Sequence, residues 1–145
     1  MEYLENALCY AGYCRLRESV GWTTPSQEQA RAALRNSLYS VAVLENGQAV
    51  GMGRLIGDGM YLLMVDLVVA PAYQGKGIGR KIVGMLIAYA AKALPDGGQT
   101  SIQLVSEKGT EPFYEKLGFT PIPNAGCGSG MKMVIHSKNQ GETKG

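Results

Sequence analysis

Three glycines alternate with other residues near the middle of the chain, in the stretch Gln74-Gly-Lys-Gly-Ile-Gly-Arg80. An apolar run over residues 61–69 precedes this stretch, and apolar residues at helical spacing follow it. The order predicts a buried strand, a turn and a helix. The first turn of a helix has four N–H groups without partners and a partial positive charge. Because Lys76 and Arg80 add full charges, the stretch predicts a receptor for phosphate or pyrophosphate.

The spacing of the glycines excludes two common phosphate motifs. No Gly-Lys-Ser/Thr sequence closes the turn, so a Walker loop with its magnesium-binding hydroxyl is absent. The glycines alternate and do not follow the G-x-G-x-x-G pattern of dinucleotide-binding folds. By itself, a glycine-rich turn before a helix is equally consistent with tight packing alone.

Two motifs together resemble the GNAT superfamily of acyl-CoA-dependent N-acyltransferases. The family signature Gln/Arg-x-x-Gly-x-Gly/Ala is matched by Gln74, Gly77 and Gly79. The segment Phe113-Tyr-Glu-Lys-Leu-Gly-Phe119 is similar to the family's Tyr-Glu-x-x-Gly-Phe segment, and weaker similarity runs from about Tyr13 to His136. The resemblance implies an N-acetyltransferase that moves an acetyl group from acetyl-CoA to a primary amine by direct attack in a ternary complex. A non-catalytic module that binds acyl-CoA and regulates a partner is the alternative.

The resemblance also implies where acetyl-CoA, the expected co-substrate, binds. The strand before the turn would hydrogen-bond the pantetheine arm through its backbone, with an N–H near Leu67 polarising the thioester carbonyl. The same strand is also expected to be core, and the two roles are compatible. The residues implied in CoA binding are Leu67, Val68, Val69, Gln74, Gly75, Lys76, Gly77, Ile78, Gly79 and Arg80.

Two residues are candidates for proton transfer. Tyr114 matches the tyrosine that serves as general acid in many GNAT enzymes, although its helical spacing with Phe113 also fits a core position. Asp66 is a lone carboxylate in an apolar strand and is a candidate base, with an outward or structurally hydrogen-bonded position as the alternative. Family members often remove the amine proton through water instead. His136, the only histidine, lies beside the tail and is expected to be a bystander.

The resemblance also implies that the acceptor site lies near the loop after the first helix. There Trp22 could form an apolar wall, and Glu18 or Asp66 could attract an ammonium group. The alternative is that Trp22 seals the helix against the sheet. Glu107 stands where the family commonly has an asparagine that contacts the pantetheine arm, so that contact is in doubt.

Length and composition predict one domain over residues 1–136 and a polar, disordered tail over 137–145. The net charge of +2 is too small to favour nucleic acid, and no apolar run reaches the length of a membrane span. The three cysteines lack metal-ligand spacing, so we expect reduced thiols, no metal and a cytoplasmic location. The N-terminus does not have the pattern of a signal peptide. We expect a small-molecule amine acceptor, no nucleic-acid or membrane partner, and leave a homodimer open.

Periodicity and turn residues predict an α+β fold whose sheet is partly parallel in its middle. The resemblance to the GNAT superfamily implies a mixed, mostly antiparallel central sheet with helices on both faces. Asn46-Gly47 predicts a hairpin turn, Ser26 predicts a helix start, and Thr110 predicts the cap of a short late helix. Helices are expected over about 6–20, from Ser26, after the glycine turn until Pro95, and after Thr110. Strands are expected over 39–44, 49–56, 61–69 and 102–105, from Phe119, and over 131–135.

Overall fold

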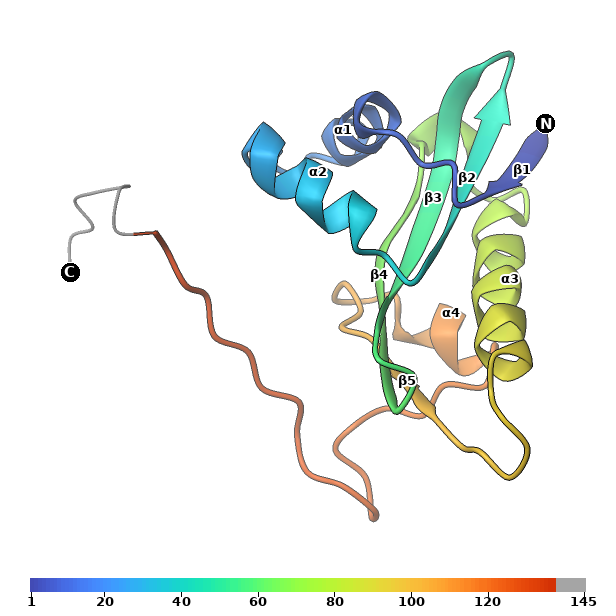
Figure 1. The fold of residues 1–145 in the computed structure, drawn as a ribbon, viewed down its shortest axis with the longest axis vertical. Helices are drawn as coiled ribbons and strands as arrows, with labels where there is room; N and C mark the ends of the chain where they lie inside the picture. Colours follow the sequence, from blue (N-terminus) through green and yellow to red (C-terminus); the bar gives the residue numbers. More distant parts are fainter. Residues whose placement is uncertain (138–145) are drawn as a thin grey trace. The chain divides into compact units, whose positions relative to one another are not determined.

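A five-stranded sheet forms the centre of the first of two compact units, Met1–Val105. In the computed structural model, which describes residues 1–137, the strands lie in chain order (Figure 1). Neighbours are antiparallel except β4 and β5, which are parallel. The mixed, mostly antiparallel sheet confirms the predicted fold class. The strands are β1 (Glu2–Glu5), β2 (Tyr39–Glu45), β3 (Gln48–Gly57), β4 (Tyr61–Val69) and β5 (Ser101–Gln103).

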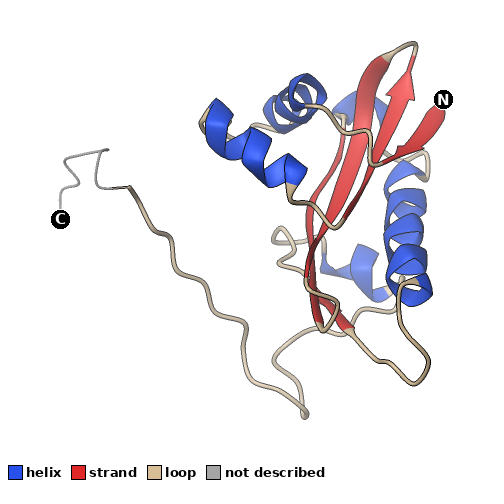
Figure 2. Ribbon diagram, in the orientation of Figure 1, coloured by secondary structure: helices blue, strands red, loops and turns tan. Residues whose placement is uncertain are grey.

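Helices cover both faces of this sheet. Helices α1 (Tyr10–Ser19) and α2 (Gln27–Arg35) lie on one face, and α3 (Ile78–Lys92) lies on the other (Figures 1 and 2). Apolar side chains from α1 and α2 pack with residues of β3 and β4 in a buried cluster. On the opposite face α3 buries a stripe of its own at helical spacing. The cluster consists of Tyr13, Leu16, Ala30, Ala49, Met52 and Val68.

Two glycines on β3 allow α3 to lie close to the sheet. A Cβ atom built on Gly53 would be 2.7 Å from Cγ2 of Ile82, and one on Gly51 would be 3.2 Å from Cγ2 of Ile78. Any larger residue at position 53 would therefore push α3 away from the strand. The strand that carries these glycines is buried along most of its length.

Local turn and cap chemistry accounts for several element boundaries. The Ser26 hydroxyl accepts a hydrogen bond of 3.2 Å from the Gln29 amide, which confirms the predicted start of α2. Asn46 and Gly47 have φ values of 52° and 77°, so the β2–β3 hairpin has the predicted tight turn.

The first unit also differs from the sequence-based expectations at its ends. Strand β1 was not predicted; it is a four-residue edge strand held by pairing with β2. The first helix begins at Tyr10 because the preceding residues belong to β1 and its connection. Strand β5 is shorter than the predicted strand over residues 102–105, and α3 ends at Lys92, before Pro95.

The second unit, which begins at Ser106, is described by itself. Its helix α4 (Glu111–Glu115) has Thr110 at the N-cap position and Pro112 in the first turn, as predicted, but the Thr110 side chain makes no cap hydrogen bond. The Thr110 hydroxyl instead donates to the Glu107 carbonyl oxygen at 2.7 Å.

The strands predicted from Phe119 and over Met131–Ile135 are wrong. The described residues 131–137 form no strand, and Met131 and Met133 are 96% and 83% exposed. A strand needs a ladder partner, and no pairing with this segment exists in the part of the chain that the structure describes. Residues 138–145, most of the predicted tail, lie outside the described residues, and the single domain over 1–136 stays a prediction.

Candidate acyl-CoA site

The glycine-rich turn connects the end of β4 to the start of α3. After Val69 the chain makes the short 3₁₀ helix η1 (Pro71–Tyr73), passes through Gln74, and enters α3 at Ile78. Gly77 occupies the position before the first helical residue, and no side chain caps the helix there. Since the first helical hydrogen bond runs from the Lys81 amide to the Gly77 carbonyl, the amides of the first turn face outward as donors.

Backbone conformation explains why glycine stands at two positions of the turn. Gly75 and Gly77 have φ values of 78° and 83°, a region that other residues adopt only with strain. A Cβ atom at either position would meet no atom within 4 Å. The space beside the helix start is therefore open, as an anion-binding turn requires.

Positive charge surrounds this opening. Lys76 and Arg80 are both exposed, and the Lys76 ammonium lies 5.3 Å from the centre of the Tyr73 ring. Together with the dipole of the fifteen-residue helix α3, these charges make the turn suited to a pyrophosphate group.

Gln74 ties the turn to the strand. Its side-chain Nε2 donates a hydrogen bond of 2.9 Å to the carbonyl oxygen of Val69, the last residue of β4. Gln74 therefore shapes the turn through a hydrogen bond to the protein's own backbone.

Replacing Gln74 with methionine keeps the length of the side chain but removes the donor. A hydrogen bond of this kind contributes about 1 kcal/mol, so we expect CoA affinity to fall about fivefold. Isothermal titration calorimetry with CoA measures the change. Gln29→Met, on the exposed side of α2, is the matched control and should bind CoA like the unaltered protein. Equal affinity in the two variants would show that the Gln74 bond does not shape the site.

Strand β4 contains a bulge just before the turn. Arg54 of β3 pairs with Val65 and Met52 pairs with Val68, so Asp66 and Leu67 together face the single residue Gly53. Asp66 has a φ of 54°, unusual for a residue with a side chain. The regular register between β3 and β4 is thus interrupted at these two residues.

The Asp66 carboxylate accepts hydrogen bonds from three side chains. Its Oδ2 lies 2.9 Å from Nε of Arg54 and 3.3 Å from the Tyr13 hydroxyl, and its Oδ1 lies 3.1 Å from Nη1 of Arg17. The Asp66 and Arg54 side chains are 9% and 8% exposed. The structure thus gives Asp66 the hydrogen-bonded position considered as the alternative to a base; its role as a base stays a prediction.

Arg17 connects this carboxylate to the loop after α1. Its Nε and Nη2 donate to the Thr23 carbonyl oxygen at 3.1 and 2.7 Å. The guanidinium carbon lies 5.4 Å from the centre of the Tyr13 ring and 5.3 Å from that of Trp22. Trp22 is partly buried and packs against the core cluster, as the sealing alternative expects. Glu18 is exposed, with the Thr24 hydroxyl 3.5 Å from its Oε1.

Tyr114 belongs to the second unit, where aromatic rings surround it. The rings of Phe113 and Phe119 meet its ring edge-to-face, with centres 5.0 and 5.9 Å away. Burial, and then the charge of Glu107, raise the pKa of the Tyr114 phenol above its usual value. An ordinary phenol is already protonated at neutral pH, so this shift leaves Tyr114 in the form that a proton donor needs.

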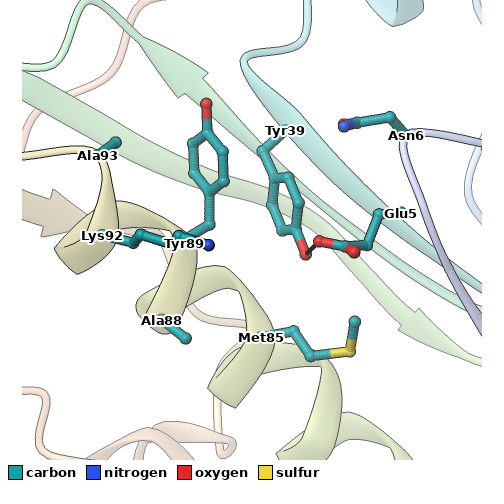
Figure 3. A pocket seen from close by; sticks show the side chains of 8 residues that line it. All are labelled: Glu5, Asn6, Tyr39, Met85, Ala88, Tyr89, Lys92 and Ala93. Atoms are coloured by element: carbon teal, nitrogen blue, oxygen red, sulfur yellow. Dashed lines mark hydrogen bonds between the residues drawn. The ribbon is translucent and has the colours of Figure 1, made fainter.

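A groove of different character lies along the later half of α3. Tyr39 of β2 stacks on Tyr89 with ring centres 4.3 Å apart, and its hydroxyl donates to Glu5 at 2.7 Å (Figure 3). Met85 and Lys92 of α3 also line this groove. Burial and the bond to Glu5 raise the pKa of Tyr39 to about 12.

This raised pKa makes the stability of the protein fall at alkaline pH. The folded state holds the Tyr39 proton more tightly than the unfolded state, whose pKa is 10.0. The Tyr39 proton therefore contributes about 2 kcal/mol to the free energy of unfolding. This contribution is fully present below pH 10 and is lost as pH rises through about 12. Denaturant unfolding between pH 9 and 11.5 should show a smaller loss for Tyr39→Phe than for the unaltered protein. If the two proteins lose the same free energy of unfolding over this pH range, Tyr39 does not have the raised pKa.

The ion cluster on the bulge is the part of the site that sequence reasoning missed. A signal existed: a carboxylate in an apolar strand requires cationic partners, and Arg54 stands on the neighbouring strand. Across residues 1–137, no group of three or more His, Cys, Asp or Glu side chains could hold a metal ion. None of the helices described is long and apolar enough to cross a membrane. Cys9, Cys14 and Cys127 are free thiols.

Comparison with known proteins gives a consistent result. Residues 14–139 match the profile of the acetyltransferase (GNAT) domain. An uncharacterised N-acetyltransferase from Pyropia yezoensis is 30% identical over 115 residues, covering 76% of this chain and 64% of that protein. The chloroplastic serotonin N-acetyltransferase 2 of Oryza sativa subsp. japonica is 35% identical over 111 residues, covering 73% of this chain and 54% of that protein. The chain thus spans between half and two thirds of the length of these relatives.

A solved structure supports the same fold. The crystal structure of a probable acetyltransferase from meticillin-resistant Staphylococcus aureus superposes with a TM-score of 0.80 at 27% identity. The superposition covers 92% of this chain and 98% of that one.

Proposed function

Because the chain belongs to the GNAT family of acetyltransferases, we propose that it transfers an acetyl group from acetyl-CoA to the primary amine of a small molecule. Acetyl-CoA is the co-substrate typical of this family. The observation that carries the proposal is the uncapped start of α3, where Gly75 and Gly77 leave open space beside Lys76 and Arg80. This arrangement fits the pyrophosphate of CoA.

The reaction proceeds by direct attack in a ternary complex. The neutral amine nitrogen attacks the thioester carbonyl carbon, a C–N bond forms, and the C–S bond breaks. The amine releases one proton, and the leaving thiolate takes one proton to become the free CoA thiol. A backbone N–H near Leu67 stabilises the negative charge that develops on the carbonyl oxygen.

Each proton transfer has a candidate group. We assign protonation of the thiolate to Tyr114, which matches the family's tyrosine and carries its phenol proton at neutral pH, as an ordinary tyrosine does. Both oxygens of Asp66 already accept hydrogen bonds from guanidinium groups. We therefore assign removal of the amine proton to water.

The test is an acetyl-transfer assay. The full chain is mixed with acetyl-CoA and a panel of primary amines: polyamines, arylalkylamines, amino sugars and aminoglycosides. Release of the CoA thiol is followed with a thiol reagent, and the acetylated amine is identified by mass spectrometry. Amine-dependent thiol release supports the proposal. Tight binding of acetyl-CoA without turnover on any amine would favour the alternative, a non-catalytic acyl-CoA-binding module.

A further inference from the structure

The bulge on β4 is held in an unfavourable backbone conformation by charged side chains. We use "bulge cluster" for Tyr13, Arg17, Arg54 and Asp66. A residue with a Cβ at positive φ costs about 1 kcal/mol or more, and the conformation persists only where its surroundings hold it there. The surroundings of Asp66 do so, because the carboxylate is bound from two directions: by Arg54 on the neighbouring strand and by Arg17 on α1.

Arg54 cannot move independently of the rest of the fold. Its side chain is 8% exposed, and its Nη1 also donates to the Ala33 carbonyl oxygen at 3.2 Å and to the Ser37 hydroxyl at 2.9 Å. The end of α2, strand β3 and the bulge are thus joined through one guanidinium group. The position of the Arg54 guanidinium group fixes one carboxylate oxygen of Asp66, and hence the direction in which the bulged residues point.

Arg17 extends the same connection to the loop that follows α1. It donates twice to the Thr23 carbonyl oxygen, and its guanidinium lies between the rings of Tyr13 and Trp22. Any displacement of the bulge must therefore change the surroundings of Trp22, the only tryptophan in the chain.

We propose that Asp66 is a positioning residue, and that the bulge cluster holds the backbone N–H of Leu67 in place for the acyl group of acetyl-CoA. The proposal rests on the function proposed above and adds the residues that set the geometry of the oxyanion donor. Leu67 follows Asp66 directly within the segment that the β3 ladder skips. The backbone angles of Asp66, among them its φ of 54°, set the direction of the Leu67 amide, and the two ion pairs hold the Asp66 side chain.

The test uses two variants and one control. Asp66→Asn keeps the size of the side chain and tolerates positive φ, but it removes the charge. Arg17→Gln removes one ion pair and leaves the buried pair of Arg54 and Asp66, so it is expected to fold even if Asp66→Asn does not. Asp96→Asn makes the same chemical change in an exposed loop. Circular dichroism and CoA calorimetry first establish that each variant is folded.

We expect the kcat of Asp66→Asn to fall about 10²-fold and that of Arg17→Gln about tenfold, since a misplaced donor costs rates of this order. The KM for acetyl-CoA should change much less than kcat, since the pyrophosphate turn is untouched, and the shape of the pH–rate profile should be retained. In the absence of substrate, the amides of residues 62–69 should exchange with deuterium faster and the Trp22 emission should shift. The control should match the unaltered protein in every measurement.

Two results would overturn the proposal. If Asp66→Asn loses the rising limb of the pH–rate profile while β4 exchange is unchanged, Asp66 is a base. If both variants turn over and exchange like the unaltered protein, the cluster does not position the bulge. If the proposed function itself is wrong, the unaltered protein transfers no acetyl group to any amine. Deuterium exchange of β4 and the Trp22 emission would still show in that case whether the bulge cluster fixes the bulge.

Discussion

Replacing Gly77 with aspartate is expected to weaken CoA binding by about 10²- to 10³-fold while the protein stays folded. The new carboxylate would stand at the uncapped start of α3, where the pyrophosphate is proposed to lie, and would also cap the helix with negative charge. Two like charges then compete for the same amides. The reduction in affinity is measured by calorimetric titration with CoA.

The fold should survive this change for a structural reason. A Cβ at Gly77 meets no atom within 4 Å, so the only cost is the φ of 83°, about 1 kcal/mol for a residue type that tolerates positive φ. Gly84→Asp provides the matched control, since Gly84 lies on the exposed side of the same helix and also has open space around it. A folded Gly77→Asp protein with unaltered CoA affinity would remove the pyrophosphate site from the turn.

Tyr114→Phe is expected to lower kcat by about 10²-fold or more with little change in the KM for acetyl-CoA. The substitution keeps the ring and its edge-to-face contacts with Phe113 and Phe119 and deletes only the proton. Since burial and Glu107 raise the pKa of the phenol, the unaltered protein should keep its acid form, and under the proposed function this step of its activity, beyond the pH at which an ordinary tyrosine ionises. Steady-state rates between pH 6 and 10.5 measure both effects.

Tyr61→Phe is the control for Tyr114. It removes the same hydroxyl from a tyrosine that is 67% exposed on β4, and we expect an unaltered kcat. Pre-steady-state measurements of thiol release would separate chemistry from product release if product release limits the unaltered enzyme. A Tyr114→Phe protein that turns over like Tyr61→Phe would return Tyr114 to a packing role.

The sequence was sufficient for features whose causes are local. The cap at Ser26, the hairpin at Asn46-Gly47 and the turn between β4 and α3 each depend on a few consecutive residues, and the structure has all three. Local chemistry also explains why the phosphate-binding residues could be named before any contact was known, although their binding role stays a prediction.

The rest could not be read from local patterns because it depends on distant partners. Strand β1 exists through its pairing with β2, more than 30 residues away in the chain. The bulge at Asp66 depends on Arg17, 49 residues earlier, and on Arg54 of the neighbouring strand. In the segment Met131–Ile135 the local pattern is misleading, because its apolar composition suits a strand. No strand forms there, since these described residues pair with no other strand in the part of the chain that the structure describes.

The glycines of β3 have a consequence for how CoA would fit between the helix start and the bulge. Gly51 and Gly53 determine how near α3 lies to the sheet, and hence how far the start of this helix stands from the bulge on β4. Under the proposed function, that distance must equal the span of CoA between its pyrophosphate and its thioester. A methyl group added deep in the interior would lengthen this span without touching any ligand-facing residue. Under the proposed function, the fit of this constant span to the site thus depends on the thickness of the packing layer between helix and sheet.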